Sequence, residues 1–108
     1  MEWPKGTVHA TDKDFDKIIA GYPKILVDFY ADWCGPCRMV GPVIEELARE
    51  MNGETVFVKV NVDESRETAM KHGVMSIPTM VIYKEGKIVD NFVGALPKAM
   101  LKQKLEQW

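Results

Sequence analysis

The chain has 108 residues and a formal net charge of −2 at neutral pH, and 46% of its residues are apolar and 28% charged. This length predicts a single domain, residues 1–108, that can bury a core without a structural disulfide. The balanced charge gives no reason to expect a nucleic acid or an anionic membrane as partner, and no apolar run reaches the roughly 18 residues typical of a transmembrane helix. The first residues do not resemble a signal peptide, so we expect a cytoplasmic location, where thiols stay reduced.

Strand-like and helix-like patterns alternate from the start of the chain. Residues 7–10 can form a short edge strand. Thr11 can then cap a helix over residues 12–20, with Asp14 as the acid of a capping box. Gly21 ends this helix.

The next strand leads into the only two cysteines of the sequence. Residues 25–30 are nearly continuously apolar, which is typical of a strand covered on both faces. Cys34 and Cys37 follow, three positions apart. On a first helical turn such residues have Cβ atoms about 5–6 Å apart, and a disulfide prefers Cα atoms about 4.4–6.8 Å apart. The pair can therefore be bonded or unbonded with little backbone movement, as a reversible two-electron redox centre requires.

The position of Cys34 adds reactivity to this spacing. If a helix begins at Gly35 or Pro36, Cys34 is its N-terminal cap, and its sulfur faces unpaired N–H groups and the positive end of the helix dipole. Both favour the thiolate, which is the nucleophilic form. Pro36 suits a first helical turn, and Gly35 places no side chain beside Cys34, so an incoming disulfide can approach.

The middle of the chain continues the alternation. Residues 55–60 form a second core strand, and Asp63 or Ser65 begins a short helix that Gly73 ends. Between the cysteines and this strand, a long helix carries apolar residues at three-and-four spacing, namely Met39, Val40, Val43, Ile44, Leu47, Ala48 and Met51.

The last third predicts a hairpin and a final helix. Strands over residues 79–83 and 87–93 are joined by a tight turn, with Gly86 at a position that needs positive φ. Pro97 fits the first turn of the last helix. The buried stripe of that helix is expected to contain Met100, Leu101, Leu105 and Trp108.

The order of elements, β-α-β-α-β-α-β-β-α, defines an α/β fold class. Strand–helix–strand units imply parallel pairing through right-handed crossovers, and the hairpin implies one antiparallel pair. The expected result is a mixed central sheet with helices on both faces. The cysteine-bearing helix then starts at the carboxyl end of a central strand, the usual site location in such sheets.

Several stretches together carry a family pattern, namely Val27-Asp28-Phe29, Ala31-Asp32-Trp33-Cys34-Gly35-Pro36-Cys37, Pro42, Lys59, Asp63, Ile77-Pro78-Thr79 and Val93-Gly94-Ala95-Leu96. Through these stretches the sequence resembles the thioredoxin family, from about Thr11 to Trp108. The resemblance implies the thioredoxin fold, a central mixed five-stranded sheet flanked by four helices, and a general protein dithiol–disulfide oxidoreductase that takes part in electron transport and cell redox homeostasis. Tyr30, where the family usually has Trp, and Met75-Ser76, where Arg-Gly is common, depart from the pattern.

The resemblance also implies a role for each catalytic residue. Cys34 is the nucleophile that attacks a target disulfide, and Cys37 is the resolving thiol that releases the reduced target. Asp28, which interrupts the apolar strand, is expected to be buried with a raised pKa and to act as general base for Cys37. Lys59 is expected to lie near Asp28 and tune it. Two alternatives stay open: Asp28 is a structural acid paired with Lys59, or Lys59 reaches solvent along its alkyl stem.

The family places a cis proline opposite the cysteines, so Pro78 is expected to be cis, although most X-Pro bonds are trans. Its loop shapes a groove in which the backbone of Ile77 can pair with an extended target peptide; the alternative is punctuation at a strand edge. A flat, mostly apolar collar around Cys34 is expected to bind the target, formed by Trp33, Gly35, Pro36, Met75, Ile77, Gly94 and Ala95.

No bound cofactor or metal is expected, because the cysteine pair carries the electrons and the chain has no Gly-rich dinucleotide fingerprint. By resemblance, the reducing equivalents come from NADPH through a separate flavoprotein thioredoxin reductase. The expected partners are that reductase and disulfide-containing target proteins, and we expect a monomer.

Other interpretations remain open. They are a thiol oxidant or isomerase on the same fold, a noncatalytic binding module, an inert structural pair, and half of a zinc site. Zinc needs two more ligands, and only His9 and His72 remain, both far from the cysteines in sequence.

Overall fold

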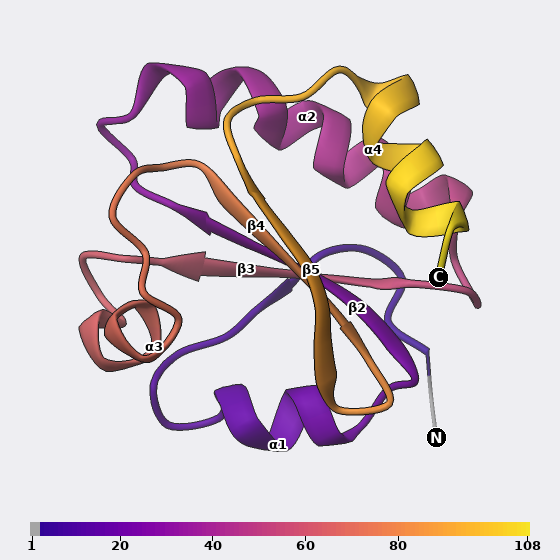
Figure 1. Ribbon diagram of the computed structural model, residues 1–108, viewed down its shortest axis with the longest axis horizontal. Helices are drawn as coiled ribbons and strands as arrows, with labels where there is room; N and C mark the ends of the chain where they lie inside the picture. The colour runs from indigo at the N-terminus through magenta and orange to yellow at the C-terminus, as the bar shows by residue number, and fades with distance from the viewer. Residues whose placement is uncertain (1–2) are drawn as a thin grey trace.

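The computed structural model describes residues 3–108, and its helices and strands follow the predicted order (Figure 1). Among these residues, no helix combines the length and the apolar character that crossing a membrane requires. The elements are β1 (Val8–His9), α1 (Phe15–Ala20), β2 (Lys24–Tyr30), α2 (Gly35–Glu50), β3 (Val56–Asn61), α3 (Arg66–Lys71), β4 (Thr79–Lys84), β5 (Lys87–Val93) and α4 (Lys98–Glu106).

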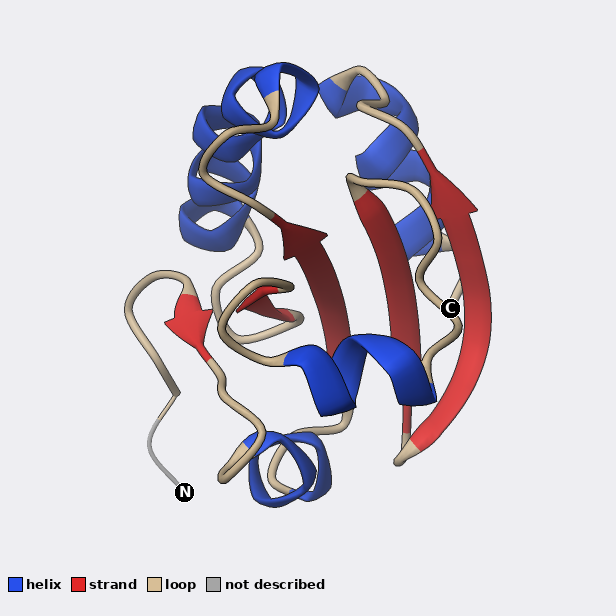
Figure 2. Cartoon of the chain, turned by 90° about the vertical axis from the view of Figure 1, so that its left-hand side faces the viewer, coloured by secondary structure: helices blue, strands red, loops and turns tan. Residues whose placement is uncertain are grey.

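The five strands form one mixed sheet in the order β1-β3-β2-β4-β5. β3 pairs in parallel with β1 and β2, whereas β4 pairs antiparallel with β2 and β5. Helices lie on both sides of the strands, with α2 and α4 on one face and α1 and α3 on the other (Figures 1 and 2). The predicted thioredoxin-type sheet, with a central β2 and an edge strand at each side, is therefore confirmed.

Alternation along β2 divides the core into two layers. Ile25, Val27 and Phe29 pack with Phe15 of α1 and its neighbours on the α1/α3 face. Leu26 packs with residues of α2 and α4 on the opposite face. Because successive side chains of a strand point to opposite faces, Asp28 and Tyr30 fall on the same side as Leu26, beneath α2.

The first helix begins later than the capping box predicts. It starts at Phe15, and residues 12–14 form turns. The backbone N–H of Thr11 nevertheless donates to Oδ1 of Asp14 at 2.7 Å, so the predicted contact exists within the turn before the helix. Asp12 accepts hydrogen bonds from the backbone and the hydroxyl of Thr68 at 2.9 and 2.7 Å, which ties this turn to α3.

Three residues expected in buried stripes are exposed. Met39 is 75% exposed, Met100 46% and Trp108 38%. Met39 and Met100 each lie one position, or about 100° of helix rotation, before a buried residue of the stripe. Trp108 lies beyond the end of α4. The stripes are narrower than the predicted ones and are centred on residues such as Ile44, Leu47, Leu101 and Leu105.

The β4–β5 hairpin confirms the predicted turn and adds one feature. Gly86 has a φ of +79°, as expected, but Glu85 also has a positive φ, of +52°. Two successive residues with positive φ define the turn type that best matches the twist of the flanking strands. A glutamate in this conformation is strained, because its Cβ crowds the following carbonyl.

Candidate active site

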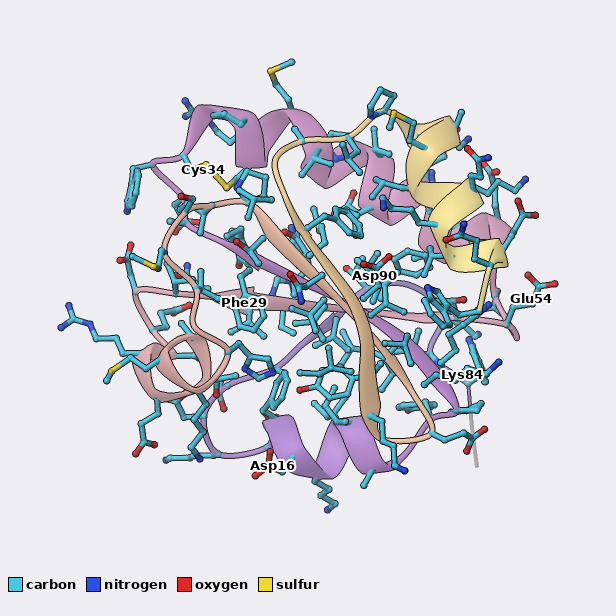
Figure 3. The ribbon with its side chains drawn as sticks, viewed as in Figure 1. Asp16, Phe29, Cys34, Glu54, Lys84 and Asp90 are labelled. Carbon is cyan, nitrogen blue, oxygen red and sulfur yellow. A yellow bond between two sulfur atoms is a disulfide. The ribbon has the colours of Figure 1, made fainter. Side chains whose placement is uncertain are left out.

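Cys34 and Cys37 form a disulfide at the start of α2 (Figure 3). Cys34 is the N-cap of this helix, with extended backbone, and Pro36 lies in the first turn. The backbone N–H of Cys37 donates to Sγ of Cys34 at 3.2 Å. This confirms the predicted capping position, and a donor aimed at the sulfur favours the thiolate once the bond is reduced.

Exposure does not separate the two cysteines, because each residue is only 5% exposed. The residues that flank Cys34 are open instead: Trp33 is 68% exposed, and Gly35 and Pro36 are exposed as well. The exposed surface next to the cysteine pair is therefore provided by these neighbours.

The Ile77–Pro78 peptide bond is cis, as the family resemblance implies. The carbonyl oxygen of Ile77 lies 3.8 Å from Sγ of Cys34, so this loop directly faces the cysteine pair. Gly94, whose φ of +107° suits glycine, donates its N–H to the Pro78 carbonyl oxygen at 2.8 Å. The structure thus brings the predicted loops of Ile77 and Gly94 to the same edge of the site.

Two other residues of the predicted collar, Ala95 and Met75, line hollows that do not include the cysteines. Ala95 lines a small groove with Met39 and Val43 of α2. Met75 is 95% exposed and lines a separate hollow beside β5, with Ile88 and Val93 among its walls. Met75 is therefore at the periphery of the site, in the direction of the β5 edge.

Asp63, which belongs to the family pattern and is also a predicted helix start, contacts a residue that flanks Cys34. Its Oδ2 accepts a hydrogen bond from the indole N–H of Trp33 at 2.8 Å. Asp63 lies two residues after the end of β3, and Trp33 lies three residues after the end of β2, its parallel neighbour. A polar residue just past the carboxyl end of a neighbouring parallel strand is the signal that could have identified this contact.

Asp28 is buried as predicted, with 1% of its surface exposed. Neither carboxylate oxygen has a hydrogen-bond partner among the described residues. Burial raises the pKa of Asp28 from 3.8 to about 6, and the charge of Lys59 partly opposes this rise. A carboxyl with a pKa near neutrality can gain and lose a proton under physiological conditions, as a general base must.

Lys59 is in register with Asp28 on the adjacent strand, and it is half-buried. The ion pairs found among residues 3–108 involve Lys98 and Lys104, so no ion pair joins Lys59 to Asp28. The Lys59 ammonium instead lies over the ring of Tyr30, 4.6 Å from its centroid. Both residues line a cleft of about 290 Å³ that also reaches Cys37.

The histidines are not gathered around the cysteines. Within residues 3–108, no group of three or more His, Cys, Asp or Glu side chains could hold a metal ion. The two ring nitrogens of His72 are hydrogen-bonded to the Thr68 carbonyl and the Tyr83 hydroxyl, at 2.7 and 2.5 Å. His72 also packs edge-on against Phe15 in an aromatic cluster under the sheet, which is a structural role.

The bond between Cys34 and Cys37 can open and close within one helical turn, so fold and site together define a protein dithiol–disulfide oxidoreductase. A family model described as Thioredoxin matches residues 6–107. The chain belongs to the thioredoxin family, and its activity is the reduction of protein disulfides.

Sequence relatives agree with this assignment. Thioredoxin 2 from Chlorobaculum tepidum is 54% identical over 99 residues, which cover 91% of each chain. A thioredoxin from Staphylococcus epidermidis is 49% identical over 100 residues, covering 93% of this chain and 95% of that protein.

Solved structures agree as well. A mutant thioredoxin from Halobacterium salinarum superposes with a TM-score of 0.93 at 33% identity, covering 100% of this chain and 95% of that one. The thioredoxin of Plasmodium falciparum gives a TM-score of 0.87 at 39% identity, covering 94% of this chain and 99% of that one.

Proposed function

We propose that this protein reduces target disulfides by two successive thiol–disulfide exchanges. The Cys34 thiolate attacks one sulfur of the target disulfide, forms a mixed disulfide and releases the other target sulfur as a thiolate. The Cys37 thiolate then attacks Sγ of Cys34, which releases the second target sulfur and leaves the Cys34–Cys37 disulfide. Two electrons pass to the target in this cycle.

The observation that carries this assignment of roles is the hydrogen bond from the Cys37 N–H to Sγ of Cys34 at the N-terminus of α2. This donor and the helix dipole stabilise negative charge on the Cys34 sulfur. Cys37 lies inside the first turn and lacks such a capping position. Cys34 is therefore the better nucleophile and leaving group of the pair.

Asp28 is proposed as the general base that takes the Cys37 proton before resolution. Its oxygens have no hydrogen-bond partner within residues 3–108, and its pKa of about 6 suits proton exchange near neutral pH. No hydrogen bond joins Asp28 directly to Cys37 among the described residues, so the proton is proposed to cross through water. The positive charge of Lys59 lowers the pKa of Asp28 and so adjusts the pH at which it acts.

The target is proposed to dock on the collar of Trp33, Gly35, Pro36, Met75, Ile77, Gly94 and Ala95, with an extended segment beside Pro78. The exposed indole of Trp33, fixed by Asp63, offers a large apolar surface next to the sulfurs. The backbone of Ile77 can pair with the segment that carries the target cysteine.

The protein is proposed to act as one domain and as a monomer in the cytoplasm, because a working dithiol needs a reducing compartment. It passes electrons to disulfide-containing target proteins and contributes to electron transport and cell redox homeostasis. NADPH supplies these electrons through a separate thioredoxin reductase, and no cofactor is bound by the chain itself.

Trapping tests the division of roles. Cys37→Ser should accumulate mixed disulfides with target proteins, because the second exchange is blocked. Cys34→Ser should accumulate none and should fail to reduce insulin disulfides with dithiothreitol as electron source. Mixed disulfides formed through Cys37 in the Cys34→Ser variant would contradict the assignment. A measured reduction potential separates a reductase from an oxidant or isomerase.

A further inference from the structure

Three charged or polar side chains meet beneath the start of α2. Tyr30 follows Asp28 by two residues on β2, so both side chains point to the same face of the sheet. Lys59 is in register with Asp28 on β3, and Tyr30 is in register with Asn61, two residues after Lys59. Tyr30 is thus the diagonal neighbour of Lys59, a position from which an aromatic ring can reach a long side chain.

The ring and the ammonium group are in contact. Nζ of Lys59 lies 4.6 Å from the centroid of the Tyr30 ring, within the range of a cation–π interaction. Nζ also lies 4.0 Å from the position that a Cβ atom on Gly41 would occupy. The ammonium is therefore close to both the aromatic ring of β2 and Gly41 of α2, a helix residue that has no side chain.

No carboxylate fixes Lys59 in this position, because the ion pairs found within residues 3–108 involve other lysines. A lysine stem is flexible, and a half-buried lysine commonly extends its ammonium into water. The cleft that holds Nζ is open to solvent, and Asp32, Arg38 and Glu45 are its other charged residues. The observed position therefore needs a cause, and the Tyr30 ring is the group in contact with the ammonium.

The position of the Lys59 ammonium matters because few other groups affect the protonation of the Asp28 carboxyl. Its oxygens have no hydrogen-bond partner among the described residues. Its neighbour in register on β4 is Met80, which carries no charge. From α2, Cys37, Arg38 and Glu45 face the same cleft as Lys59. Among the described residues, Lys59 is the cation whose charge lowers the pKa of the Asp28 carboxyl, against the larger effect of burial.

We propose that Tyr30 is a positioning residue, whose ring holds the Lys59 ammonium inside the cleft and so sets the pH range over which Asp28 exchanges its proton. Without the ring, the ammonium moves out towards solvent and its effect on Asp28 weakens. The inference rests on the proposed role of Asp28 for its consequence in catalysis, but the coupling itself is a property of the resting, oxidised protein.

The test compares Tyr30→Leu with Tyr30→Phe, each alone and combined with Lys59→Met. Tyr30→Phe keeps the aromatic face and is the matched control. The readout is the titration midpoint of the Asp28 carboxyl carbon, followed by 13C NMR in the oxidised protein, in which neither cysteine titrates. Thermal unfolding of each variant verifies that it is folded.

Tyr30→Leu is expected to raise the Asp28 midpoint by at least about half a pH unit, part of the coupling between two unit charges a few ångström apart. Tyr30→Phe should leave the midpoint where it is. In the Lys59→Met background, exchanging Tyr30 for Leu should produce no comparable rise, because no ammonium remains to be displaced. This last comparison removes any effect of altered water access in the cleft.

Two results would overturn the inference: an unchanged or lowered midpoint in Tyr30→Leu, or the same rise with and without the Lys59 ammonium. If Tyr30→Leu does not fold, Gly41→Val provides the second route, since its branched side chain occupies the space beside Nζ while the ring stays in place. It should raise the midpoint only when Lys59 is present, and Gly41→Ala should not.

Catalysis gives a separate readout. If Asp28 is the general base, the pH profile of mixed-disulfide resolution should shift with the midpoint in Tyr30→Leu. An unshifted profile together with a shifted midpoint would refute the role of Asp28 and leave the ring–ammonium coupling standing. An unshifted midpoint would refute the coupling alone.

Discussion

Replacing Asp28 with asparagine should stabilise the oxidised protein at neutral and alkaline pH. Asp28 is 1% exposed, and neither of its oxygens has a hydrogen-bond partner among the described residues. The ionised carboxylate is therefore held in a site that solvates it poorly. Asparagine is close in shape to the protonated acid and carries no charge, so the substitution removes this penalty with little change in packing.

The size of the effect follows from the raised pKa. Burial raises the pKa of Asp28 from 3.8 to about 6, or by about two units. Each unit corresponds to about 1.4 kcal/mol, so the ionised group destabilises the fold by about 3 kcal/mol. Because the folded protein binds this proton more tightly than the unfolded chain does, the penalty is complete above a pH of about 6 and disappears below about 4.

Guanidinium unfolding at pH 8 and pH 4 measures this difference. At pH 8, Asp28→Asn should raise the free energy of unfolding by about 3 kcal/mol, which moves the midpoint by about 1 M if the slope is about 3 kcal/mol/M. At pH 4 the variant and the parent should unfold together. Asp16→Asn, which removes an exposed carboxylate from α1, is the control and should show no such pH-dependent gain. An equal gain at both pH values would refute the electrostatic reasoning.

Three further predictions address other parts of the molecule. Mixed-disulfide resolution should accelerate as the pH rises through about 6 and then level off, since the basic form of Asp28 exists above its pKa; stopped-flow rates should be about 10²-fold lower in Asp28→Asn and should lose this dependence. Glu85→Asn should raise the free energy of unfolding by about 1 kcal/mol, because asparagine tolerates the positive φ of this turn position better than glutamate does; an unchanged denaturation midpoint would argue against strain at Glu85. Gly41→Ala should stabilise α2 by about 0.5–1 kcal/mol, because the added Cβ makes only an ordinary contact with Lys59 Nζ at 4.0 Å; a loss of stability in urea unfolding would show that the cleft cannot accept a methyl group.

The features of the site that depend on local sequence could be predicted. The capping position of Cys34 followed from Gly35 and Pro36 beginning a helix directly after the strand. The burial of Asp28 followed from its place in an apolar strand, since alternation fixes which face a side chain takes. The cis bond before Pro78 did not follow from local physics, because most X-Pro bonds are trans, and only the family resemblance indicated it.

The features that depend on register between distant segments could not be predicted. The contact between Tyr30 and Lys59 requires that β2 and β3 pair with Asp28 opposite Lys59. The hydrogen bond between Trp33 and Asp63 depends on the same pairing. The edges of the helical stripes could not be predicted either, because a three-and-four pattern does not determine how wide a buried face is. Met39, which this pattern assigns to the buried stripe, is exposed.

The spacing of the two cysteines has a consequence for recognition. Their Cα atoms are 5.2 Å apart, and residues three apart in an unconstrained α-helix are separated by about the same distance, roughly 5 Å. Gaining or losing the bond therefore leaves the outline of the molecule almost unchanged. A partner that distinguishes the oxidised protein from the reduced one therefore cannot rely on the overall shape and has to contact the two sulfur atoms directly.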